Sequence, residues 1–110
     1  MKSKVFNWIR STKTPGLMEK EINDFINDKV FKYAVQNESS KNGRVMLTVF
    51  YDKASDKNKA NCAATVLRTQ GHTALEEQLN EVLSTVKGSM IMTTQTFSNN
   101  TISTILFHGK

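Results

Sequence analysis

The chain contains one pattern twice, and this repeat limits its fold more than any other feature of the sequence. Residues 17–53 align with residues 74–110 at a constant offset of 57 positions (17 onto 74, 53 onto 110), without a gap. Apolar residues recur at the same places, and the identical positions are Glu19 and Glu76, Asn23 and Asn80, Asn42 and Asn99, Phe50 and Phe107, and Lys53 and Lys110. Self-similarity at a fixed period indicates one structural unit built twice.

Each copy predicts a strand, a helix and two further strands. Alternating apolar and polar residues predict the strands, and an apolar stripe with spacings of three and four predicts the helix. The predicted strands are 4–10, 31–36, 45–51, 62–68, 89–96 and 101–108, and the predicted helices are 15–27 and 73–86. Thr14 and Thr73 can cap the helices, the latter with Glu76 at capping-box spacing. Asn42-Gly43 predicts a hairpin turn.

A single unit of three strands and one helix is marginal by itself, so we expect both copies to share a core. The expected class is α+β: two βαββ repeats, 4–53 and 61–110, joined by the linker 54–60 within a single domain, 1–110. We expect them to form one six-stranded, mostly antiparallel sheet with two helices on one face. The far face is expected to carry Phe6, Trp8, Met46, Phe50, Leu67, Ile105 and Phe107. A face this apolar predicts a homo-oligomer.

The composition is typical of a soluble globular protein, with a hydrophobic fraction of 38% and a charged fraction of 23%. No apolar run is long enough to span a membrane, so we expect no membrane partner. The basic N-terminus has no apolar segment behind it, which predicts a cytoplasmic protein, in the host cytoplasm if a phage encodes it. Cys62 is the single cysteine and is expected to be a buried hydrophobe. We expect no metal ion and no cofactor.

No set of residues in the sequence predicts catalysis. Asp52, His108 and several serines are present, but no motif holds them together, and no phosphate-binding glycine loop occurs. Neighbouring carboxylates such as Glu76 and Glu77 fall on the polar faces of the predicted helices, which is typical of surface charge. We therefore expect a binding protein with no catalytic residue rather than an enzyme.

The loop before each predicted helix is the strongest candidate for a binding site. A helix N-terminus offers free N–H groups and a partial positive charge, and an arginine adds a bidentate donor for phosphate. The candidate ligand-binding residues are Arg10, Thr12 and Lys13 in the first copy, Arg68, Thr69 and His72 in the second, and Phe97, in a predicted turn, to stack a base. The alternative is that both arginines are surface residues paired with helix carboxylates. A net charge of +5 also favours an anionic partner.

The first copy resembles the small sporulation-associated proteins of spore-forming bacteria, which consist of one βαββ unit. The matching residues are Glu21-Ile22-Asn23-Asp24-Phe25-Ile26, Lys32-Tyr33 and Val49-Phe50-Tyr51-Asp52, over about half of the chain. The chain departs from that family in the long loop 10–16, in the duplication and in the second copy, which keeps only the hydrophobic skeleton. The resemblance implies no enzyme activity and no defined ligand.

In size, duplicated layout and expected oligomerisation, the chain is also similar to phage-encoded anti-defence sponges. Those proteins trap cyclic nucleotide or cyclic ADP-ribose signals made by bacterial immune systems such as Thoeris and CBASS. The paired arginine loops, the basic charge and the Lys/Asn/Ile usage, which is typical of Firmicutes, carry this similarity. It implies that the chain sequesters a phosphate-bearing small molecule such as one of these signals, and this is the leading hypothesis from the sequence.

Two further functions remain open at this point. The first alternative is a structural or assembly module that acts through protein–protein contacts, as the sporulation resemblance implies. The second, ranked last, is single-stranded nucleic-acid binding by sheet aromatics such as Phe50 and Phe107, because no RNA-recognition signature is present.

Overall fold

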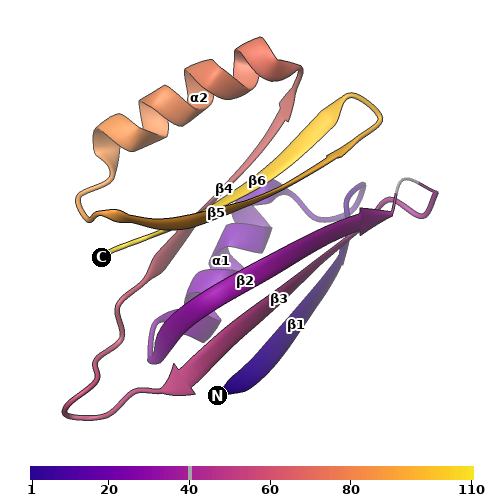
Figure 1. Ribbon diagram of the computed structural model, residues 1–110. Helices are drawn as coiled ribbons and strands as arrows, with labels where there is room; N and C mark the ends of the chain where they lie inside the picture. The colour runs from indigo at the N-terminus through magenta and orange to yellow at the C-terminus, as the bar shows by residue number, and fades with distance from the viewer. Residues whose placement is uncertain (40) are drawn as a thin grey trace.

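The computed structural model describes residues 1–39 and 41–110 and has the element order β-α-β-β-β-α-β-β (Figure 1). The elements are β1 (Lys2–Ile9), α1 (Pro15–Ile26), β2 (Lys29–Ser39), β3 (Arg44–Lys53), β4 (Ala63–Gln70), α2 (His72–Thr85), β5 (Met90–Ser98) and β6 (Thr101–His108). Within the described residues, neither helix is long and apolar enough to cross a membrane.

The α+β class is confirmed, but the expected six-stranded sheet is wrong. The strands form two separate antiparallel sheets of three, in the orders β1-β3-β2 and β4-β6-β5. We call them sheet 1 and sheet 2. The edge strands β2 and β5 lie near each other, yet their contacts include side chains rather than a shared ladder: Gln36 on β2 binds Thr94 and Thr96 on β5.

Burial explains how the two repeats pack against each other through α1 and β4 and through β2 and β5. One face of sheet 2 carries Val66, Ile105 and Phe107, which are too apolar to remain in water. The chain covers this face with α1 and sheet 1, so that Phe107 stacks on Phe31 of β2 with ring centroids 4.3 Å apart. The other face of sheet 2 lies under α2 (Figure 1). The helices therefore do not lie on one face of one sheet.

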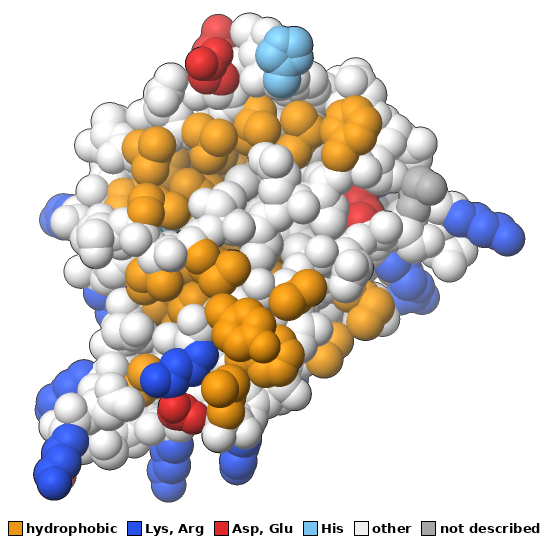
Figure 2. All heavy atoms as spheres, viewed as in Figure 1, with side chains coloured by type: hydrophobic (Ala, Val, Ile, Leu, Met, Phe, Trp, Pro, Cys, Tyr) orange, Lys and Arg blue, Asp and Glu red, His pale blue; other side chains and the backbone are white. Residues whose placement is uncertain are grey.

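This arrangement divides the residues that were expected on a single far face. Phe6 and Trp8 are buried on the α1 side of sheet 1, where Trp8 Nε1 donates to Glu21 Oε2 at 2.9 Å. The other members fall in different places: Met46 and Phe50 on the outer face of sheet 1, Ile105 and Phe107 between the repeats, and Leu67 beneath α2. Since Figure 2 shows orange side chains exposed over β2 and β3, part of sheet 1 remains uncovered.

The two repeats correspond strand by strand, although not at one offset. The third strands match at the sequence offset of 57, which places Met46 over Ser103 and Phe50 over Phe107. Pairing within each sheet then places Asn7, the partner of Met46, over Arg68, the partner of Ser103. The first strands therefore correspond at an offset of 61. The ladders of both second strands also carry an irregularity at equivalent places.

The helix starts differ between the repeats. Thr14 caps α1 as predicted, because its Oγ1 accepts a hydrogen bond from the Leu17 N–H at 3.2 Å. Thr73 does not cap α2, which begins one residue earlier at His72. Its N-cap is Gly71, whose φ of +79° suits glycine and whose lack of a side chain leaves the helix start without a side-chain cap.

Candidate functional site

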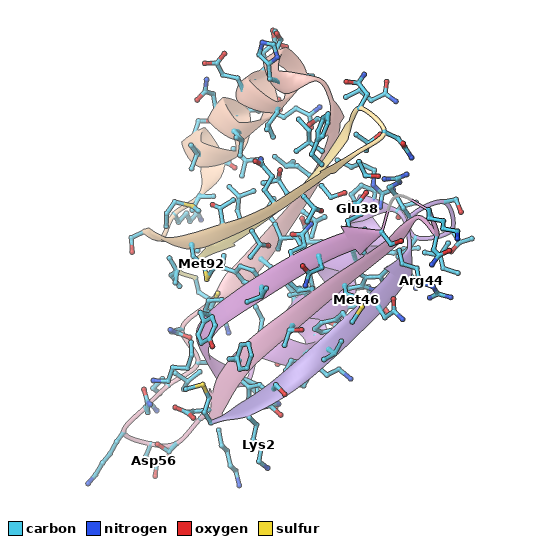
Figure 3. All side chains as sticks on the ribbon, turned by 45° about the vertical axis from the view of Figure 1, so that its right-hand side comes forward. Lys2, Glu38, Arg44, Met46, Asp56 and Met92 are labelled. Atoms are coloured by element: carbon cyan, nitrogen blue, oxygen red, sulfur yellow. The ribbon has the colours of Figure 1, made fainter. Side chains whose placement is uncertain are left out.

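Arg10 follows β1 directly, and its guanidinium forms an ion pair with Glu38 at the end of β2. The Glu38 side chain is 1% exposed, and its second oxygen accepts a hydrogen bond from Thr96 Oγ1 on β5 at 2.9 Å. Figure 3 shows Glu38 at the end of β2, where the two sheets approach each other. A buried carboxylate is costly without a charged partner, so Arg10 is committed to Glu38 within the first repeat. The hydrogen bond from Thr96 to Glu38 links this ion pair to the second repeat.

Arg68 reaches from β4 into the loop between β1 and α1. Its guanidinium donates to the backbone oxygens of Arg10 (3.2 Å) and Lys13 (3.0 Å) and contacts Met18 Sδ at 3.3 Å. Its buried Nε has no hydrogen-bond partner among the described residues. Burial first, and then the charge of Arg10, lower the pKa of Arg68, while Glu38 opposes this shift. Two backbone carbonyls thus already accept hydrogen bonds from the guanidinium that was expected to hold phosphate.

The two arginines are not equivalent in the repeat. Arg68 lies within β4 and corresponds to Asn7, whereas Arg10 follows the end of β1. The pairing of Arg10 with Arg68 in the sequence alignment therefore does not hold, because the first strands correspond at a different offset from the rest. The arginines still meet, but in one partly buried cluster between the repeats rather than in two similar loops.

The other predicted ligand-binding residues lie in separate places. Thr12 Oγ1 donates to the Ile9 carbonyl at 3.1 Å, and Lys13 Nζ pairs with Glu21 at 3.3 Å. Thr69 is buried on the α2 side of sheet 2, opposite to Arg68, and its hydroxyl has no partner among the described residues. His72 is exposed at the first position of α2, and Phe97, near the end of β5, is 68% exposed. The structure brings only Arg10, Lys13 and Arg68 together.

A basic cavity lies at another place, where β1 starts and β3 ends. It measures about 570 Å³ and is lined by Lys2, Asp28, Lys29, Tyr51, Lys53 and Ala54; we call it the lysine cavity. Lys2 and Lys53 form no ion pair with any residue that the structure describes, while Lys29 Nζ lies 2.6 Å from Asp28 Oδ1. That hydrogen bond lowers the pKa of the Asp28 carboxyl group. Several lysines gather at this lower end of the molecule in Figure 2.

Two aromatic rings, Tyr51 and Phe25, lie close to the lysines of this cavity. Tyr51 meets Phe25 edge to face with ring centroids 5.0 Å apart, and Lys29 Nζ lies 4.8 Å from the centre of the Phe25 ring. Lys4 Nζ lies 5.8 Å from the same ring, and Lys110 Nζ donates to the Asn27 carbonyl at 2.9 Å. The cavity therefore combines Lys2 and Lys53, which are unpaired among the described residues, with one aromatic lining residue, Tyr51, and a nucleotide-like anion uses both features.

Sequence reasoning missed this cavity because its residues come from three element ends. Lys2 and Tyr51 are paired in the β1–β3 ladder, and Lys29 and Lys53 are paired in the β2–β3 ladder. The available signal was the placement of lysines near predicted strand ends, but these lysines entered the prediction only through the net charge. Only the strand register shows that these lysines meet.

The described residues offer little for covalent or metal chemistry. Cys62 is fully buried, as expected, and burial raises the pKa of its thiol to about 12, so the reactive thiolate is scarce. No group of three or more potential metal ligands occurs among residues 1–39 and 41–110. Of the two aromatics considered for nucleic-acid stacking, Phe107 is fully buried, and Phe50 stacks on Tyr33 at the outer face of sheet 1.

No protein-family model, curated protein sequence or solved structure matches the chain.

Proposed function

We propose that this protein is a non-catalytic binding protein that sequesters a phosphate-bearing small molecule in the lysine cavity. The observation that carries the proposal is the meeting of Lys2, Lys29 and Lys53 beside Tyr51. A cavity of about 570 Å³ is within the size range of small-molecule sites. Lysines bind phosphate as point charges, and the Tyr51 ring offers a surface for a base. A cyclic nucleotide or cyclic ADP-ribose signal has both chemical features.

The cavity replaces the arginine loops as the proposed site, because Arg10 and Arg68 already bind Glu38 and loop carbonyls. The ligand class and the non-catalytic role are those expected from the sequence, whereas the residues differ. Binding at an open cavity of this kind depends on charge and should weaken as salt is raised.

Isothermal titration calorimetry with a panel of cyclic mono- and dinucleotides and cyclic ADP-ribose tests the proposal. We expect at least one of them to bind and to be recovered intact when the complex is heated. The double variant Lys2→Ala/Lys53→Ala should weaken binding about tenfold or more. The matched control, Lys41→Ala/Lys87→Ala, removes two exposed lysines outside the cavity and should leave the affinity unchanged. No binding by any compound at high micromolar concentration, or equal losses in both variants, refutes the proposal.

A second candidate is an assembly module that acts through protein–protein contacts. The observation in its favour is an exposed apolar surface on sheet 1, where Val5, Tyr33, Val35 and Met46 are each between 42% and 49% exposed. An apolar patch of this kind on a small protein typically marks an interaction surface. Loss of partner binding on substitution of this face, with the lysine cavity intact, distinguishes this function from the first.

A further inference from the structure

The contact between the two repeats includes a covered strand edge. Along the outer edge of β4, Glu19 Oε1 of α1 accepts a hydrogen bond from the Val66 N–H at 2.8 Å. Asn23 binds Ala64 twice: its Nδ2 donates to the Ala64 carbonyl at 2.9 Å, and its Oδ1 accepts from the Ala64 N–H at 2.8 Å. Two helix side chains thus satisfy the backbone groups that an edge strand otherwise leaves open.

The corresponding edge of β1 is open. The Arg10 N–H donates to the Gly43 carbonyl on the β3 side. Backbone groups of alternate residues point to opposite sides of a strand, so those of Val5 and Asn7 point away from β3. They have no backbone partner within the described part of the chain. A groove of about 440 Å³ follows this edge, and its lining includes Val5, Asn7, Lys4, Lys13 and Arg44.

Helix α2 corresponds to α1, the helix that covers the β4 edge, and the equivalent surface of α2 is exposed. A groove of about 410 Å³ on α2 is lined by His72, Leu75, Glu76, Leu79, Asn80 and Leu83. The last five occupy, at the offset of 57, the positions of Met18, Glu19, Ile22, Asn23 and Ile26 in α1. Ile26 is fully buried, whereas Leu83 is 46% exposed. Glu76 and Asn80, which correspond to the edge-binding pair of α1, are both exposed.

Charge on the two open surfaces is complementary. Helix α2 contains Glu76, Glu77 and Glu81 and no Lys or Arg. The groove along β1 instead contains three cations, Lys4, Lys13 and Arg44, and one carboxylate. Opposite charge favours the encounter of these two surfaces and disfavours contact of either surface with itself.

Apolar surface beside the two grooves is matched as well. The Phe31–Phe107 stack joins the repeats within the chain, and its counterparts by strand register are Met90 on β5 and Phe50 on the outer face of sheet 1. Met90 is 38% exposed. Figure 2 shows exposed orange side chains along α2 and the β5–β6 hairpin, and a separate group over β2 and β3. Each group corresponds, in the other repeat, to a surface that is buried in the contact between the two repeats.

We propose that α2 and β5 of one copy bind the β1 edge and outer face of sheet 1 of a second copy, repeating the contact between the repeats. In this contact Glu76 accepts a hydrogen bond from the Val5 N–H of the second copy, and Asn80 binds the backbone of Ser3, because these residues correspond to Val66 and Ala64. The two surfaces differ, so the contact is head-to-tail and generates a ring or an open chain of copies. The proposal deepens the second candidate function and does not depend on the lysine cavity.

Sedimentation equilibrium on the full chain tests association directly. The unmodified protein should associate at micromolar concentration, as specific interfaces of standard size do. Glu76→Lys should weaken association about tenfold or more, while Glu77→Lys, the same charge change at the next residue and outside the groove, should not. Val5→Lys should disrupt the opposite surface. Because Glu76 and Val5 are exposed, thermal unfolding of the dilute, monomeric protein should remain close to that of the unmodified chain in all three variants.

A mixing experiment isolates the head-to-tail geometry. Each of Glu76→Lys and Val5→Lys retains one intact surface, so each alone should be monomeric and their equimolar mixture should form a dimer and nothing larger. A mixture that stays monomeric, or an unmodified chain that remains monomeric to about 100 µM, overturns the proposal. Calorimetry on the same variants measures nucleotide binding to the lysine cavity separately, so that one proposal can fail while the other is still tested.

Discussion

Helices α1 and α2 have the same apolar spacing and different surroundings. Met18, Ile22 and Ile26 of α1 are fully buried, whereas no residue of α2 is buried. Each helix packs on its own sheet, but α1 is also covered by the second repeat, and none of the described elements covers the other side of α2. The comparison teaches that an apolar stripe predicts a helix that packs, while the number of layers above it decides how much of the helix is buried.

This difference should have its largest effect on the stability of variants in which an apolar helix side chain is shortened to alanine. Ile22→Ala should lower the free energy of unfolding by about 2–5 kcal/mol, because it leaves a cavity between sheet 1, α1 and β4. Leu79→Ala, at the corresponding position of α2, should cost about 1 kcal/mol, because Leu79 is only half-buried. Urea unfolding followed by the fluorescence of the single tryptophan, Trp8, at low protein concentration measures both. Equal losses would mean that α2 is as well covered as α1.

A second comparison concerns the ends of β2 and β5. By strand register Glu38 corresponds to Phe97, since Val45 and Ile102, their ladder partners, are 57 positions apart. Glu38→Ala should cost about 3 kcal/mol by leaving the Arg10 charge partly buried without a partner. Phe97→Ala should change stability by less than about 0.5 kcal/mol, since the ring is 68% exposed.

The control for Glu38→Ala is the double variant Arg10→Ala/Glu38→Ala, which removes both charges and should recover part of the loss. If the single variant is as stable as the unmodified chain, the ion pair does not stabilise the fold. If Phe97→Ala is neutral for stability but weakens association, the ring acts between copies rather than within the fold.

The third comparison tests the edge-binding asparagines. Asn23→Ala should cost about 2 kcal/mol, because the N–H and the carbonyl of Ala64 both lose their partner in a partly buried place. Asn80→Ala should leave the stability of the dilute protein unchanged, because the described structure gives Asn80 no comparable strand to bind. Chemical unfolding of both variants at low concentration checks this, and equal losses would show that Asn80 already has an intramolecular role.

The sequence predicted the elements well and their assembly only in part. Hydrophobic spacing locates both helices within a residue or two, and the Asn99-Asn100 turn has the positive φ values expected of asparagine. The single sheet was wrong because periodicity shows that a strand has an apolar face but not what covers it. The predicted correspondence of Arg10 with Arg68 did not hold because the first strands correspond at a different offset. A shift by an odd number of residues moves a strand side chain to the opposite face of the sheet. The lysine cavity depends on register, which local sequence does not specify.

The smallest expected difference is at the helix starts. Thr14→Ala should lower the free energy of unfolding by about 1 kcal/mol, since the Leu17 N–H loses its capping oxygen. Thr73→Ala should change stability by less than about 0.5 kcal/mol, because α2 starts at His72 behind Gly71 and takes no side-chain cap. Thermal unfolding of both variants distinguishes these outcomes. A clear loss in Thr73→Ala would mean that α2 begins in solution with the capping box that the sequence predicts, and that the two helix starts are more alike than the structure describes.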